Sequence, residues 1–172
     1  MNKQQYRTVI GWFNARPAAK KALRAVSTGA AAAVYLLYLG LLAWLAWHAM
    51  WAPLGVTAVV PAAAFVVGTA LRAAINRPRP YTKYGFVPLF PKDKTGQSMP
   101  RRIAATVWYV LPPLGAVLAV LAVIIAVSRV VTGVHFVSDV LAGLAFGLVF
   151  AVAGRVAYIA AASALGFYAI MV

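Results

Sequence analysis

Long apolar runs, separated by short polar and basic stretches, dominate the pattern of the chain. An apolar run of about 20 residues is long enough for one helix to cross the hydrocarbon core of a bilayer. Such runs cover residues 29–51, 56–75, 114–128 and 136–172. The pattern therefore predicts an all-α fold, an integral membrane helical bundle of about four to five spans.

The first 28 residues form a basic flank, and we expect a single transmembrane domain over residues 29–172. The flank contains a small apolar and aromatic cluster at Val9, Ile10, Trp12 and Phe13. Two interpretations of this cluster stay open: a short amphipathic helix in the membrane interface, or a solvated flank. After the first span, the sequence of residues 51–55 predicts a tight turn.

Two segments between the spans stand out. Residues 76–102 form a polar connection rich in proline, and a connection of about 25 residues is usually functional. It is followed by residues 103–111, which as a helix would cover only about 14 Å, roughly half the hydrocarbon thickness. Whether residues 103–111 form a span is left open by the sequence.

Composition narrows the function classes. The chain is 64% hydrophobic and 10% charged, with no cysteine, two acidic residues and a formal charge of +14. These values exclude a soluble enzyme, a disulfide scaffold, cysteine-ligated zinc and a catalytic site built from several carboxylates. The basic residues flank apolar spans, so the positive-inside bias explains them better than nucleic-acid binding. We therefore expect no metal, no cofactor and no nucleic-acid partner.

One charged cluster, around His135, has the residue types of a catalytic site. His135 and Asp139 are four residues apart, so on a helix they share a face. A carboxylate that holds one imidazole nitrogen leaves the other as an oriented nucleophile or base. Arg129 supplies a planar cation suited to phosphate, and Arg72 and Arg79 would add two more. The structural alternative is an ordinary helix-surface pair with interfacial arginines.

Together, the residues around His135 and the pair Arg72 and Arg79 resemble the signature of the type-2 phosphatidic acid phosphatase superfamily. Ser128-Arg129, five residues, His135, three residues and Asp139 match its third motif, and Arg72, six residues and Arg79-Pro80 match its first with Arg in place of Lys. The resemblance implies that His135 is the nucleophile of a phosphohistidine mechanism and that Asp139 orients it. It also implies that Arg72, Arg79 and Arg129 bind the substrate phosphate, without a metal.

The second motif departs from the family pattern. Where the family has Pro-Ser-x-His, this chain has Pro100-Arg101-Arg102-Ile103, so the histidine that would protonate the leaving oxygen is missing. The remaining candidates for a phosphate loop are Ser98 and Arg101. The short segment that follows is interpreted as an internal deletion of about ten residues, since a full span of about 20 follows this motif in the family.

These features predict a membrane lipid-phosphate phosphatase, impaired by the missing histidine. The alternative is an inactive family member that binds anionic lipid. The substrate class is a polyprenyl or phospholipid phosphate or diphosphate in the bilayer, and the sequence does not determine the oligomeric state. The positive-inside rule predicts that the N-terminus and the active-site face are cytoplasmic, in a bacterial-type plasma membrane.

Overall fold

The described part of the chain folds into helices joined by short connections, without strands. The computed structural model describes residues 1–76, 78–90, 107 and 111–164, with Arg72 and residues 157, 158 and 161–164 described by their backbone alone. The helices are α1 (Lys3–Asn14), α2 (Pro17–Trp47), α3 (Trp51–Ile75), α4 (Pro80–Tyr84), α6 (Pro112–Val131) and α7 (Val137–Ala164). Within these residues, α2, α3, α6 and α7 are long and apolar enough to cross a bilayer. The all-α membrane bundle predicted from the sequence is confirmed.

Helices α2, α3 and α6 begin earlier than the apolar runs indicate. Helix α2 begins at Pro17, inside the basic flank. Proline is accommodated there because a backbone N–H in the first helical turn has no hydrogen-bond partner within the helix. The tight turn predicted at residues 51–55 is wrong, because these residues form the start of α3. Pro53 is tolerated there for the same reason. The reversal is instead made by residues 48–50, where Ala49 has a positive φ of 52°.

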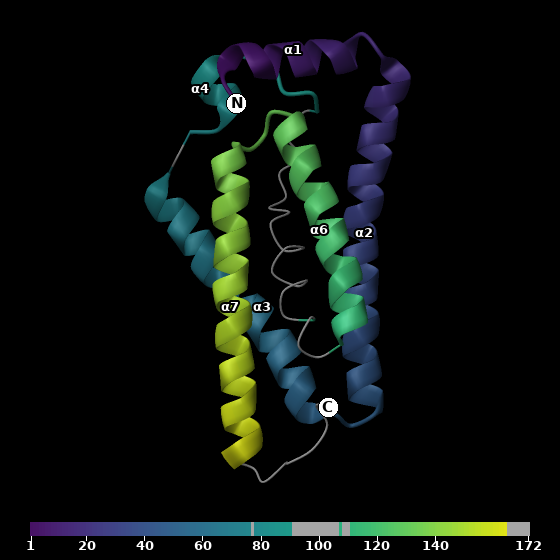
Figure 1. Ribbon diagram of the computed structural model, residues 1–172, viewed down its shortest axis with the longest axis vertical. Coiled ribbons are helices and arrows are strands. Elements are labelled where there is room, and N and C mark those ends of the chain that lie inside the picture. Colours follow the sequence, from purple (N-terminus) through teal and green to yellow (C-terminus); the bar gives the residue numbers. More distant parts are fainter. Residues whose placement is uncertain (77, 91–106, 108–110, 165–172) are drawn as a thin grey trace.

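The membrane bundle is built from two packed helix pairs. In one pair α2 lies against α6, and in the other α3 crosses α7, with α2 also touching α3 (Figure 1). Small residues permit the close approach: Ala30 and Ala31 of α2 are buried together with Ala122 of α6. Gly154 of α7 does the same, since a Cβ there would lie 2.9 Å from a methyl carbon of Val60.

The first and third motifs, as far as the structure describes them, lie at one end of the bundle. Helix α1 lies across this end, next to α4 and the connection between α6 and α7, whereas the α2–α3 turn and the start of α6 lie at the other end (Figure 1). The backbone N–H of Leu89 donates to the carbonyl of Thr132 at 3.2 Å, which ties the segment after α4 to that connection.

The short segment 103–111 is described at two positions. Val107 is fully buried in the core between α2 and α6, and it accepts a backbone hydrogen bond from Leu111 at 2.8 Å. Leu111 precedes α6 at the end of the bundle away from α4. Leu89, bonded to Thr132, and Leu111 thus lie at opposite ends of the bundle. The other residues of 103–111, and with them the question of a span, lie outside the described residues.

Candidate active site

The site is organised by the five-residue connection between α6 and α7. The N–H groups of Val134 and His135 both donate to the carbonyl of Arg129 at 3.2 Å, which closes the chain back on the end of α6. Gly133 allows this reversal because its φ is +75°, a left-handed conformation that favours glycine. A larger residue at position 133 would also lack room for its side chain, because a Cβ there would lie 2.7 Å from Cε2 of Phe86.

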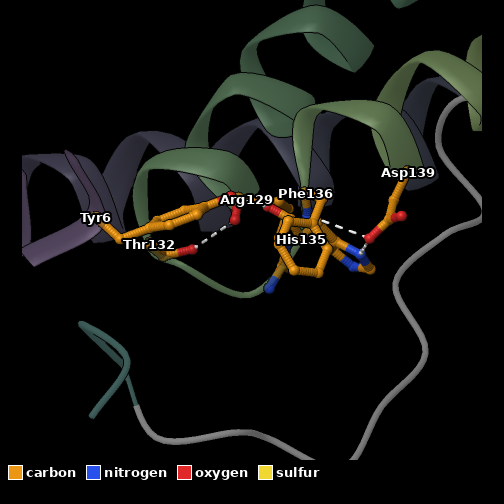
Figure 2. Close-up of polar contacts among 6 residues, drawn as sticks. All are labelled: Tyr6, Arg129, Thr132, His135, Phe136 and Asp139. Carbon is orange, nitrogen blue, oxygen red and sulfur yellow. Dashed lines mark hydrogen bonds and ion pairs between the residues drawn. The ribbon is translucent and has the colours of Figure 1, made fainter. Parts of the chain in front are cut away.

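His135 and Asp139 meet across the start of α7 (Figure 2). The Nδ1 atom of His135 lies 4.0 Å from Oδ2 of Asp139, and both side chains are partly exposed, 24% and 29%. The spacing argument placed both residues on one helix, and this detail is wrong, because α7 begins at Val137 and His135 precedes it. The two side chains still face each other, because Asp139 lies in the first turn of α7 and His135 lies just before it.

The carboxylate of Asp139 has a second contact. Its Oδ2 accepts a hydrogen bond from the backbone N–H of Phe136 at 3.1 Å, which caps the start of α7. A negative charge is also favoured at this end of the helix by the aligned peptide dipoles. Asp139 is thus held where it can face Nδ1 of His135 and leave Nε2 directed away from it.

The arginines enter the site end from three different elements. Arg129 is in the last turn of α6, where the helix dipole favours a cation. Arg79 is the residue that precedes α4, whose Tyr84 ring lies 6.0 Å from the ring of Phe136. Arg72 lies in the last turn of α3 and is described by its backbone alone. Ser98 and Arg101, the candidates for a phosphate loop, lie outside the described residues.

Ser128, the first residue of the third motif, is part of the helix packing. It is buried, its Oγ donates to the carbonyl of Ile125 at 2.7 Å, and it lies 3.1 Å from Oγ of Ser27. These contacts tie the end of α6 to α2, and so fix the base from which Arg129 and the connection start.

Sequence reasoning missed an aromatic cluster where α1, α4 and the α6–α7 connection meet. Tyr6 of α1, Tyr84, Phe86 and Phe136 place their ring centroids within 5.5–6.4 Å of one another in four pairs. The hydroxyl of Tyr6 donates to the carbonyl of His135 at 3.1 Å, although 129 residues separate them (Figure 2). Lys83 adds a cation 5.9 Å from the Phe136 ring. The apolar cluster in the flank was the one sequence signal that α1 packs against the rest of the protein.

The flank helix is therefore seated on the protein rather than freely solvated. Tyr6 and Ile10 are buried, while Trp12 on the same helix remains 48% exposed. The second histidine, His48, follows the last residue of α2 at the opposite end of the bundle, and its ring lies 4.8 Å from the ring of Trp44. Among the described residues, no three His, Cys, Asp or Glu side chains gather in a group that would hold a metal ion.

Comparison with known families gives one match. The model of the PAP2 superfamily matches residues 51–164, from the first residue of α3 to the last residue of α7. No curated protein and no solved structure matches the chain at the significance required. The matched range includes both motifs and their histidine and arginines, and it excludes α1 and α2.

Proposed function

We propose that this chain, which belongs to the PAP2 superfamily of phosphatases, hydrolyses a lipid phosphate or diphosphate through a covalent intermediate on His135. Nε2 of His135 attacks the terminal phosphorus, and the bond from this phosphorus to the oxygen of the lipid or of the lipid phosphate breaks. The lipid alkoxide or the lipid monophosphate leaves, and the phosphoryl group stays on the histidine. Water then attacks the same phosphorus, the phosphorus–nitrogen bond breaks, and phosphate leaves. Asp139 stabilises the imidazolium, as a buried carboxylate does in other histidine-dependent sites.

One observation carries this proposal: Asp139 faces Nδ1 of His135 at the end of the bundle that also holds α4 and the end of α6. Catalytic pairs are often longer than a hydrogen bond before substrate binds, so a separation of 4.0 Å is compatible with this role. Arg129 and Arg79, with Arg72, supply the positive charge that a transferring phosphoryl group requires.

The missing histidine of the second motif affects the leaving group. Without a general acid the lipid oxygen departs unprotonated, and the loss of such an acid typically costs about 10²–10⁴-fold in rate. Departure is easier when the leaving group is itself a phosphate, because its pKa is far lower than that of an alcohol. We therefore expect slow turnover that favours a lipid diphosphate over a lipid monophosphate.

The site end of the bundle suits a substrate held in the bilayer. Helix α1 lies across the ends of the spanning helices (Figure 1), which is where lipid headgroups would meet water, and its exposed Trp12 suits such an interface. This end carries Lys3, Arg7 and Arg129, whereas residues 48–55 carry no lysine or arginine. By the positive-inside rule, the site would face the cytoplasm.

A second candidate function is supported by the sequence of the second motif. The second motif carries positive charge in Pro100-Arg101-Arg102-Ile103 and lacks the histidine that would act as general acid. Both features fit a protein that binds anionic lipid without turnover. The two functions differ in their dependence on His135: hydrolysis requires it, whereas charge-based binding requires the arginines only.

The test is phosphate release from a panel of lipid monophosphates and diphosphates by the purified protein in detergent. His135→Ala should abolish release, and His48→Ala should leave it unchanged, because His48 lies at the other end of the bundle. Release that persists in His135→Ala would overturn the phosphohistidine mechanism. Absence of release in every form, with lipid-phosphate binding that survives His135→Ala, would establish the inactive binding protein instead.

A further inference from the structure

A residue outside the family match holds the backbone of His135. The hydroxyl of Tyr6 donates to the carbonyl oxygen of His135 at 3.1 Å, and the N–H of His135 donates to the carbonyl of Arg129 at 3.2 Å. The peptide groups on both sides of His135 are therefore fixed, one from α1 and the other from α6. Tyr6 precedes residues 51–164, so nothing in the family match accounts for it.

The Tyr6 ring is fixed as firmly as its hydroxyl. Tyr6 is 0% exposed, it stacks on Phe86 with centroids 5.5 Å apart, and it meets the edge of Phe136 at 6.4 Å. One turn further along α1, Cδ1 of Ile10 lies 3.2 Å from where a Cβ of Gly133 would be. Helix α1 thus rests on the connection that carries His135.

The hydroxyl also stays a donor over the working range of pH. Burial raises the pKa of Tyr6 above its ordinary value, and the neighbouring Tyr84 and Asp139 raise it further. A protonated phenol at a fixed position can hold a carbonyl oxygen, and a displacement of about 1 Å at a reacting group can cost 10²-fold in rate. A rigid donor to the main chain of the nucleophile therefore affects the reaction rate directly.

We propose that Tyr6 is a positioning residue, which holds the main chain of His135 so that its imidazole faces Asp139 and the incoming phosphorus. This inference rests on the proposed function in so far as it concerns turnover. It makes the N-terminal helix a working part of the active site.

The experiment compares Tyr6→Phe with Tyr84→Phe, which makes the same chemical change in the same aromatic cluster, on a hydroxyl that is not bonded to His135. Two readouts are taken on each purified protein. The first is kcat and KM for the best lipid phosphate of the panel. The second is the rate at which diethyl pyrocarbonate modifies His135 relative to His48, followed by peptide mass spectrometry. His48 serves as an internal reference, because it lies at the other end of the bundle and is one of only two histidines.

In Tyr6→Phe we expect kcat to fall about tenfold with KM unchanged, and the His135 to His48 modification ratio to rise several-fold. Tyr84→Phe should leave both readouts at the wild-type values. Unchanged kcat and ratio in Tyr6→Phe, or equal effects in the two variants, would overturn the proposal in favour of ring packing alone. A raised ratio specific to Tyr6→Phe in a protein without turnover would support the positioning of His135 while showing that the proposed function is wrong.

Discussion

Asp139 serves two partners with one carboxylate oxygen. Its Oδ2 caps α7 through the N–H of Phe136 and also faces Nδ1 of His135. Asn and Ala substitutions separate these roles, because an asparagine keeps an oxygen for the cap and loses the charge that supports the imidazolium. The structural role and the chemical role of this residue are therefore open to independent measurement.

We expect Asp139→Asn to keep nearly the wild-type stability and to lose most phosphate release. Asp139→Ala should lose release as well and should also destabilise the protein by about 1 kcal/mol, the usual cost of a lost helix cap. Thermal unfolding in detergent and the release assay together measure the two effects. Wild-type release by Asp139→Asn would show that the carboxylate is a cap and nothing more.

Tyr6 gives a second prediction at this scale, in the alkaline range. Because its pKa is raised in the folded protein, its contribution to stability is complete below the ordinary tyrosine pKa of about 10 and is lost as the pH rises through the folded value. Wild type should exceed Tyr6→Phe by about 1 kcal/mol at pH 8, through the hydrogen bond to His135. That difference should shrink above pH 10 in denaturant titrations, and a difference independent of pH would contradict it.

At the scale of elements, the connection between α6 and α7 depends on Gly133. Alanine there would adopt a left-handed φ, which costs roughly 1–2 kcal/mol, and its Cβ would press against the Phe86 ring. We expect Gly133→Ala to destabilise the protein by at least about 2 kcal/mol and to reduce phosphate release. The matched control is Gly11→Ala in α1, where a Cβ meets nothing within 4 Å.

Gly11→Ala should be neutral or stabilising by up to about 1 kcal/mol, because alanine is the better helix former. Thermal unfolding of both variants, with wild type beside them, tests the pair. Equal stability of Gly133→Ala and wild type would mean that the connection has a different backbone conformation from the one described.

The elements also show how far the sequence alone could lead. Apolar runs predicted the four spans, because a bilayer demands about 20 apolar residues of any crossing helix. They misplaced the turn near Trp51, since a proline in a first helical turn has the same local signature as a proline in a loop. The spacing around His135 and Asp139 predicted that they face each other. Tyr6 could not be predicted, because its bond to a main-chain carbonyl 129 residues away leaves no local pattern.

The whole molecule has two chemically different ends. Helix α1 with the α6–α7 connection brings Lys3, Arg7 and Arg129 to one end, whereas residues 48–55 at the other end carry no lysine or arginine. For such an asymmetry the positive-inside rule predicts that the basic end faces the cytoplasm. A substrate would then have to present its phosphate at the cytoplasmic surface.

Orientation is directly testable because the chain contains no cysteine. Gln4→Cys in α1 and His48→Cys at the end of α2 each introduce one exposed thiol, at opposite ends of the bundle. In intact cells, a membrane-impermeant maleimide should label His48→Cys and spare Gln4→Cys until the membrane is permeabilised. The reverse pattern would place the active site outside.

The most direct test of the central claim is to trap the phosphoryl group on the protein. The wild-type protein is mixed with a lipid diphosphate or monophosphate carrying labelled phosphorus, quenched in alkali within milliseconds to seconds, and digested for mass spectrometry. We expect label on the peptide that contains His135, stable in alkali and lost in acid, present in His48→Ala and absent from His135→Ala. Phosphate release by the wild-type protein with no label on His135 at any quench time, or label that persists in His135→Ala, would contradict the account.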